Sequence, residues 1–434
     1  MRTQPLIGAL WLAAGLSVGM EAAQAAHPHP AAAPEDVVLG HSVDGLLVAA
    51  RARSPELAAM RFEADAASAR AEQAGALDDP MLLTELRDFT NESRGGGATL
   101  IPSKVGSTRY VLSQSLPWWG KRDNRRAAAG ASADEVRGRA LATWEDLAAR
   151  IKAGYAQYYR LYHSLRLNRE LRDLTVRLER IARVRYASGL APQQDAIRAQ
   201  LELTAMEGEL AQLDSELHGQ QARLNTLLGR PVEAPLAAPQ ELRPVPRIDA
   251  ARHADLERHL RERNPLLGAE GARVLAAEKT RDVTYDNRRP DFRVGVGAVQ
   301  MGSRVAEWEL MFEMNIPLQQ GVRRAQEGEA NAMLSAARAR RSQAENAALG
   351  ELAHAITDLQ AAQRVDELTT QSLLPQAELS FQAALAGYET GKVDFATLLE
   401  AQRQIRQYRL AQLKAQTDAQ MWLAEIERAV GDTL

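Results

Sequence analysis

Cysteine is absent from the 434 residues of this chain. Its absence excludes disulfide bonds, thiol catalysis and metal sites built on thiolates. It also removes the residue to which a lipid anchor would be attached at a mature N-terminus. An excess of charge of one sign is lacking too, because 53 basic and 56 acidic side chains leave a formal net charge of −3. No basic patch indicates a nucleic-acid partner.

Long hydrophobic runs are missing everywhere except at the N-terminus. Residues 1–25 combine Arg2, an apolar core from about Leu6 to Met20 and the small-residue pattern Ala23-Gln24-Ala25. This order is typical of a secretory signal peptide, with cleavage expected after Ala25. Beyond it, no apolar run approaches the length of about 18 residues that indicates a membrane-spanning helix. We therefore expect an exported chain that carries no lipid.

Proline is nearly missing from two long stretches that are rich in alanine, leucine, arginine and glutamate. Lys121–Gly189 contains none, and Gly321–Gly391 contains only Pro375. At a rise of about 1.5 Å per residue, the first stretch predicts a helix of roughly 100 Å. Pro375 is expected to kink or break the second long helix.

A return helix is expected after each long stretch, at about Pro192–Leu228 and Val393–Val430. The first return helix carries apolar residues at steps of three and four from Leu203 to Leu227, which is typical of a coiled-coil seam. Aromatic residues make up only 5% of the chain. Such helices indicate hairpins packed side by side into a hollow wall rather than a thick core. A soluble coiled-coil rod would show the same helices.

The same order of signals occurs twice along the chain. The matched positions are Ser54-Pro55 and Asn264-Pro265, Pro80 and Pro290, Leu116-Pro117 and Ile316-Pro317, and Tyr186–Gly189 and Tyr388–Gly391. A period near 200 residues is too long for a solenoid repeat, so we expect a duplicated half-domain. The first repeat is expected at 26–228 and the second at 248–434, joined by a proline-rich linker at 229–247.

Each repeat is expected to contain one β-hairpin, and the second, at about 290–317, shows strict alternation. Apolar side chains share one face, which we predict to contact lipid: Phe292, Val294, Val296, Trp308, Leu310, Phe312 and Met314. Acidic side chains share the other face, which we predict to line a lumen: Glu307, Glu309 and Glu313. This period of two is typical of a transmembrane β-strand, although a half-buried strand of a soluble sheet shows it too.

The hairpin of the first repeat, at about 80–117, alternates less clearly, with an expected first strand at Met81–Thr90. Four strands cannot close a barrel alone, and an open edge is not viable in lipid. If the strands cross a membrane, several copies of the chain must therefore assemble.

These features together resemble the outer membrane factor family, the TolC-type outer membrane efflux proteins, over essentially the whole mature chain. The most specific motifs are Asp79-Pro80, the string Ser113–Arg122, Leu374–Ala377 and Ala386–Gly391. The string Gln-Ser-Leu-Pro-Trp-Trp-Gly-Lys-Arg at 114–122 is similar to the CzcC-like branch, which serves heavy-metal efflux pumps.

The resemblance implies a mainly α-helical protein with a small membrane β portion. Three copies would join their strands into one outer membrane barrel of twelve strands, and their long hairpins would form a periplasmic helical tube, an α-barrel. The implied partners are further copies of the chain, a periplasmic adaptor (a membrane fusion protein), an inner-membrane transporter of the RND type and outer membrane lipid. The implied location is the outer membrane of a Gram-negative bacterium. The implied role is that of a conduit, with no enzymatic reaction and no cofactor.

The resemblance also implies a constriction at the periplasmic end of the tube, near the turn after Tyr-x-x-Gly. The acidic positions of the family fall on Thr397 and Glu400, with Asp394 one turn earlier. We therefore expect Glu400, Thr397 and Asp394 at the constriction. Asp195 and Arg198 in the first repeat, together with Tyr388, are expected to make the contacts that hold it closed.

Several alternatives remain open on the sequence alone. The same architecture serves the export of drugs or organic solutes and type I secretion, and only the motif at 114–122 favours metal cations. A periplasmic adaptor also has a long helical hairpin, but only one. No structural or catalytic metal site is predicted from the eight histidines. His27 and His29 could bind a metal loosely at the mature N-terminus, but Pro28 lacks a backbone N–H that a terminal copper or nickel chelate would need.

Overall fold

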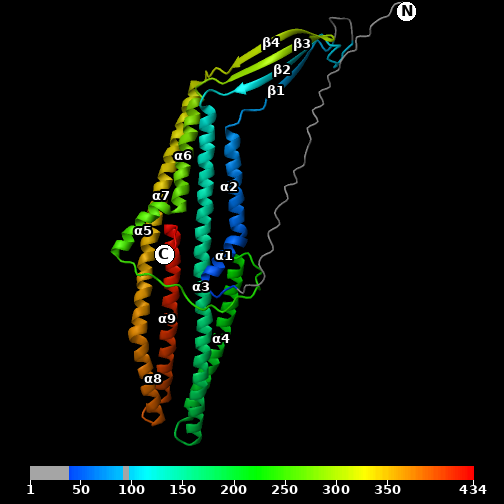
Figure 1. Ribbon diagram of the computed structural model, residues 1–434. Helices are drawn as coiled ribbons and strands as arrows, with labels where there is room; N and C mark the ends of the chain where they lie inside the picture. Colours follow the sequence, from blue (N-terminus) through cyan, green and yellow to red (C-terminus); the bar gives the residue numbers. More distant parts are fainter. Residues whose placement is uncertain (1–38, 91–96) are drawn as a thin grey trace, which may run out of the picture. The chain divides into compact units, whose positions relative to one another are not determined.

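The order of secondary structure elements repeats along the chain (Figure 1). The computed structural model describes residues 39–90 and 97–434, so the expected signal peptide lies outside the described residues. The first half contains α1 (Val43–Arg53), α2 (Pro55–Ala74), β1 (Met81–Arg87), β2 (Ser107–Leu116), α3 (Lys121–Ala187) and α4 (Gln193–Leu227). The second half contains α5 (Ala250–Arg263), α6 (Pro265–Asp286), β3 (Phe292–Met301), β4 (Arg304–Met314), α7 (Gln320–Leu368), the π-helix η2 (Thr369–Leu373), α8 (Leu374–Glu389) and α9 (Phe395–Val430). The predicted duplication is confirmed.

In both halves, the glycine that follows the return helix lies against the proline that begins a shorter helix. Gly229 follows α4 with a φ of +65°, and a Cβ on it would lie 3.2 Å from Pro55 Cδ. Gly431 follows α9 with a φ of +75°, and a Cβ there would lie 2.9 Å from Pro265 Cδ. The left-handed backbone and the close approach both require glycine. The end of each return helix is thereby fixed against the start of α2 or α6.

The two hairpins form one antiparallel sheet in the order β1-β2-β3-β4. The halves meet between β2 and β3, where Leu112 pairs with Val296 and Leu116 pairs with Phe292. β1 is shorter than expected because Asp88 has a φ of +50°, which ends the extended backbone at Arg87. Among the described residues, the outer edges of β1 and β4 pair with no further strand.

α3 runs without a break for 67 residues, which corresponds to about 100 Å. α4 returns along it, as Figure 1 shows, and Met206 and Leu224 of the predicted seam are fully buried. Apolar side chains of α1, α3 and α4 form one core: Val43, Leu46, Leu147, Ile151, Tyr155, Tyr158, Leu161, Leu165, Leu217 and Leu224. In the described part of the chain, no helix has the length and hydropathy that a membrane span requires.

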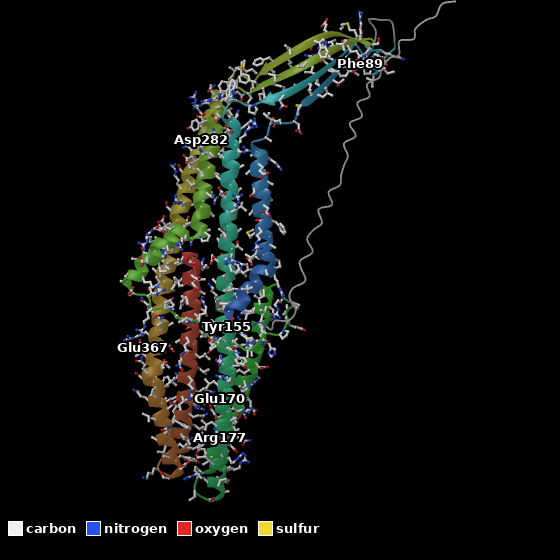
Figure 2. All side chains as sticks on the ribbon, in the orientation of Figure 1. Phe89, Tyr155, Glu170, Arg177, Asp282 and Glu367 are labelled. Carbon is white, nitrogen blue, oxygen red and sulfur yellow. The ribbon has the colours of Figure 1, made fainter. Side chains whose placement is uncertain are left out.

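The linker between the halves packs against α3 and the start of the described chain. Tyr155, labelled on α3 in Figure 2, donates its hydroxyl hydrogen to the carbonyl oxygens of His41 (2.6 Å) and Glu241 (3.2 Å). The backbone N–H of Ala237 donates to the carbonyl oxygen of Leu39 at 2.8 Å. The linker is extended, as its prolines predicted, but these hydrogen bonds fix it against the helices.

The second long α-helix is interrupted just before Pro375, as predicted, and the interruption is a π-helix. α7, the π-helix and α8 follow one another directly, and Pro375 lies in the first turn of α8. The buried positions Leu161 and Ala182 of α3 are 21 residues apart, whereas the corresponding Ala362 and Ala384 are 22 apart. A π turn accommodates one additional residue in a continuous helix. Pro375 thus stands at the start of the α-helix that follows the interruption.

A buried ion cluster joins the two halves and the linker. Lys152 of α3 and Glu427 of α9 form a salt bridge of 2.8 Å, with 5% and 1% of their side chains exposed. Arg243 of the linker donates two hydrogen bonds of 2.9 Å to the same carboxylate. Burial by itself would raise the pKa of Glu427, but the hydrogen bonds from Arg243 and the charge of Lys152 hold this pKa below its ordinary value.

We predict that Glu427→Gln lowers the free energy of unfolding at neutral pH by about 3–5 kcal/mol, because it leaves Lys152 buried without its counter-charge. The folded state binds fewer protons at Glu427 than the unfolded state does. This contribution is therefore complete above the unfolded pKa and is lost as the pH falls below it. Thermal melting in detergent, followed by circular dichroism, should show a stability difference between wild type and variant that narrows in acid.

The matched control is Glu56→Gln, which breaks an exposed ion pair with Arg150, whose side chain is 49% exposed. This change should cost about 0–1 kcal/mol. Equal losses in the two variants would contradict the assigned role of the buried cluster.

Candidate functional site

The turn between α8 and α9 has a geometry set by its glycine and by an aspartate cap. Gly391 has a φ of +75°, and the N–H of Lys392 donates to the Gly387 carbonyl oxygen at 2.8 Å. Asp394 accepts from the Thr397 hydroxyl at 2.5 Å and from its backbone N–H at 3.0 Å, and these bonds lower the pKa of Asp394. Asp394 is thus the N-cap of α9, a role that its position before the helix could have indicated.

The two helical turns are joined by Tyr388, Asp195 and Arg185. Tyr388 is 3% exposed, and its hydroxyl lies 3.4 Å from Asp195 Oδ2. Burial raises the pKa of Tyr388 to about 12 and also raises the pKa of Asp195. Arg185 lies 4.9 Å above the Tyr388 ring and donates to the Glu389 carbonyl oxygen at 2.7 Å. The structure therefore brings together two of the predicted contact residues, and Arg185 is a third that the sequence did not single out.

Arg198 forms no ion pair with any residue of 39–90 or 97–434. Burial raises the pKa of Asp195, and the positive charge of Arg198 partly offsets this rise. The hydrogen bonds from Thr397 lower the pKa of Asp394, and Arg198 adds to this lowering. Its predicted contact with a neighbouring helix stays a prediction about assembled copies.

Glu400 and Thr397 lie on α9 within the first turns after the tip. Glu400 is exposed, and its carboxylate has no hydrogen bond or ion pair within the described residues. Thr397 is exposed, and its hydroxyl donates a hydrogen bond to Asp394. An acidic constriction requires a carboxylate that no neighbouring cation neutralises, and Glu400 provides an exposed one near the start of α9.

The predicted apolar face of the sheet is a single exposed surface. The register of β3 and β4 pairs Phe292 with Met314, Val294 with Phe312, Val296 with Leu310, and Ala298 with Trp308. Leu310 is 89% exposed and Trp308 is 76% exposed. On β2 and β1, Leu112 and Leu82 extend the same face and are exposed too. An apolar patch of this kind is unusual on a surface that faces water.

The opposite face of the sheet carries paired charges. Arg293 lies opposite Glu313, and their side chains are 3.1 Å apart. Arg109 of β2 contacts Glu309 at 2.5 Å. Glu307 forms no ion pair with the described residues. The ion-pair partners of the two arginines could not be predicted from the sequence, because they depend on the register between strands.

The string at 114–122 forms the junction between the sheet and the long helices. Lys121 is 2% exposed, and its ammonium lies 2.9 Å from Asp291 Oδ2. The backbone N–H of Trp118 donates to Asp291 Oδ1 at 3.0 Å, and the Trp118 and Trp119 rings pack against Phe292. The lysine and tryptophans of this motif thus connect the first half to the start of β3.

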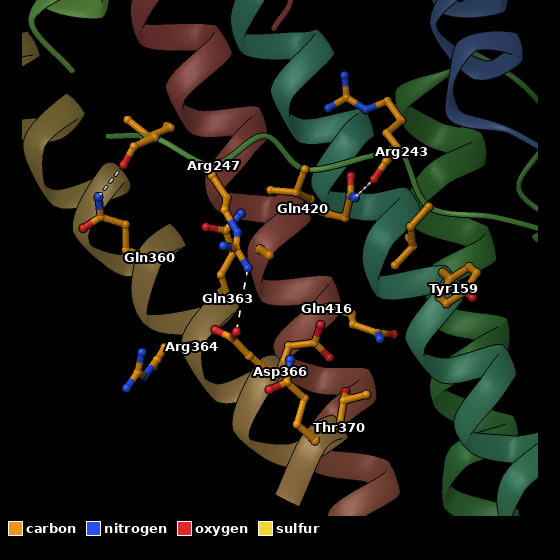
Figure 3. Close-up of a pocket in the computed structure, with 16 residues that line it drawn as sticks. Tyr159, Arg243, Arg247, Gln360, Gln363, Arg364, Asp366, Thr370, Gln416 and Gln420 are labelled. Atoms are coloured by element: carbon orange, nitrogen blue, oxygen red, sulfur yellow. Dashed lines mark hydrogen bonds and ion pairs between the residues drawn. The ribbon is translucent and has the colours of Figure 1, made fainter. Parts of the chain in front are cut away.

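A cavity of about 700 Å³ lies between the linker, α7, the π-helix and α9. Figure 3 shows Asp366, Thr370 and Gln416 among its lining residues. Gln360 and Gln363 stand at the repeat positions of Tyr159 and Tyr162, so the second half has less side-chain bulk here. No group of three or more histidine, aspartate or glutamate side chains in the described residues could hold a metal ion.

Comparison with known proteins gives consistent relatives for both halves. The family model described as outer membrane efflux protein matches residues 46–230 and 256–432. The chain is 25% identical over 385 residues to the cobalt-zinc-cadmium resistance protein CzcC of Cupriavidus metallidurans, covering 86% of each chain.

Two channel structures share the fold. The outer membrane protein VceC of Vibrio cholerae has a TM-score of 0.76 and 21% identity, over 90% of this chain and 96% of that one. CusC has a TM-score of 0.77 and 17% identity, over 90% and 92%. The chain therefore belongs to the outer membrane efflux protein family.

Proposed function

We propose that this chain is the exit duct of a tripartite efflux pump and that it works as a homotrimer in the outer membrane. The observation that carries the proposal is the four-stranded sheet, because one face is apolar and exposed while the other is charged. The first face suits contact with lipid and the second suits a water-filled lumen. The family membership supports the same function.

The open edges of the sheet support assembly. Backbone groups in the hydrocarbon layer must be hydrogen-bonded, so β1 and β4 need partners from other copies. The smallest closed membrane barrels have about eight strands, so two or more copies are required. Three copies would close a barrel of twelve strands with β4 of one copy beside β1 of the next.

The long helices support a conduit rather than an enzyme. α3 and α4, and α7 to α9, are two hairpins whose copies would surround a periplasmic passage. We infer that the protein performs no covalent chemistry and that energy for transport comes from an inner-membrane transporter of the RND type. A periplasmic adaptor would connect that transporter to the helical tips.

The contact between Tyr388 and Asp195 supports a closed tip in this conformation. It joins the second hairpin to the first at the level of both turns. Opening the passage would require the two hairpins to separate here. Glu400 lies in the second turn of α9, at the same end of the hairpin as this contact. In a trimer it would form an acidic ring.

We propose heavy-metal cations as the cargo. The support comes from the relative named as a cobalt-zinc-cadmium resistance protein and from an unpaired carboxylate at Glu400. The motif at 114–122 contributes less than its resemblance suggests, because Lys121 and the two tryptophans serve the junction with the sheet.

The sheet faces give the first test. Leu310→Arg should place a charge against lipid and cost about 2–4 kcal/mol near the midplane, so trimers should be depleted from outer membrane fractions. Glu307→Arg is the matched control, because Glu307 lies on the charged face and has no ion pair to lose in the described residues. Heat-modifiable migration of the trimer measures both. Equal depletion in the two variants would show that the faces are assigned wrongly.

The acidic ring gives the second test. In planar bilayers, Glu400→Gln should lower cation selectivity and weaken block by multivalent cations, because threefold symmetry removes three charges at once. Trimer assembly should be unchanged, since the side chain is exposed. Unaltered selectivity and block would exclude Glu400 from the ion path.

The cargo gives the third test. Deleting the gene for this chain from its own bacterium should lower the concentrations of cobalt, zinc and cadmium salts that permit growth, and the wild-type gene should restore them. Dyes, detergents and organic solvents serve as controls. Sensitivity to those compounds with unchanged metal tolerance would instead favour a duct for organic solutes.

A further inference from the structure

Glu202 of α4 is a buried carboxylate that bridges two arginines of α9. Its side chain is 6% exposed. Oε2 lies 3.1 Å from Arg403 Nε and 2.5 Å from Arg403 Nη2. Oε1 lies 3.8 Å from Arg406 Nη2. Both oxygens therefore face guanidinium groups, and neither belongs to the contact between Tyr388 and Asp195 at the tip.

The two arginines depend on Glu202 to different degrees. Arg406 also contacts Glu209 of α4 at 2.7 Å, so it keeps a carboxylate partner without Glu202. Arg403 forms ion pairs with no other residue of the described chain. The backbones of α4 and α9 contact each other in few places. These charge pairs are therefore formed by long side chains that cross between the two return helices.

Arg403 lies close to Glu400 on the exposed side of α9. The two residues are three positions apart, which places them on one helix face. The side chain of Arg403 is 51% exposed, and Glu400 is exposed too. A surface that contains both has one negative and one positive charge per copy unless a further group neutralises one of them. Glu202 is that group, because its carboxylate forms the ion pair with Arg403, whereas Glu400 has only a weaker electrostatic interaction with the same guanidinium.

We propose that Glu202 maintains the cation selectivity of the duct by neutralising Arg403 beside Glu400. The inference deepens the proposed function, on which it rests, by naming the residue that keeps the passage suitable for cations. A guanidinium stays charged at every physiological pH. Without Glu202, threefold symmetry would therefore place three arginines that have lost their buried partner next to the Glu400 ring, where they would offset its charge.

The test is a set of charge variants of the full-length protein, purified as trimers and measured in planar bilayers under a potassium chloride gradient. Glu202→Gln should shift the reversal potential toward the chloride equilibrium potential. Arg403→Gln should shift it toward the potassium equilibrium potential, because it leaves the carboxylate without its main partner. The double variant Glu202→Gln/Arg403→Gln should return the reversal potential to the wild-type value.

Glu209→Gln is the matched control. It removes the same charge from the same helix, seven residues further from the turn, but Arg406 keeps Glu202 as a partner. Its reversal potential should stay close to that of the wild type. If both variants shift the reversal potential equally, the shift depends only on the loss of one negative charge and not on the pairing of Glu202 with Arg403. That result would overturn the proposal.

Failure of this inference can be distinguished from failure of the proposed function. If wild-type trimers form cation-selective channels but the double variant keeps the shift of Glu202→Gln, then Glu202 acts on the structure and not through the charge of Arg403. If wild-type protein forms no channels, the proposed function itself fails. Single-channel conductance and trimer migration, recorded for every variant, separate misfolding from altered selectivity.

Discussion

The edges of the sheet are the constraint on which the rest of the architecture depends. β1 and β4 leave backbone groups without a strand partner among the described residues, and hydrocarbon cannot satisfy them. An assembly of several copies removes this problem and at the same time sets the spacing of the helices below. The salt bridge between Lys121 and Asp291 fixes the start of α3 against the start of β3. Further along α3, the buried salt bridge between Lys152 and Glu427 joins the two halves. The orientation of the sheet and that of the helices are therefore coupled through these contacts.

The sequence predicted the features that repeat with a fixed period. Alternation assigned Leu310 and Glu309 to opposite faces, and the matched Tyr-x-x-Gly turns revealed the duplication. Features that depend on distant partners were not predictable in this way. The pairing of Arg109 with Glu309 requires the register between β2, β3 and β4, and the bridge from Glu202 to Arg403 requires the distance between two helices. Asp394 was assigned to the constriction, although its local sequence also suits the helix cap that the structure shows.

The string at 114–122 has a structural role that is separate from any role in choosing the cargo. The string at 114–122 carries the resemblance to heavy-metal pumps, yet its lysine is buried in an ion pair and its tryptophans pack against Phe292. Such packing contacts would serve the fold of a duct whatever its cargo. The exposed charges on α4 and α9 are under no such restriction, since surface pairs contribute little to stability. Differences in cargo are therefore better sought near Glu400 than at the junction.

The π-helix before Pro375 has a consequence for how the two halves diverge. An α-helix turns by about 100° per residue, so one inserted residue would rotate every later side chain of a long helix away from its neighbours. Here the rotation is confined to Thr369–Leu373, and Ala377, Ala384 and Tyr388 remain buried beyond it. A long tube can thus tolerate a change in chain length without losing its packing. A π-helix of this kind allows the two repeats to differ by one residue in length while the turns at the ends of their hairpins still lie side by side.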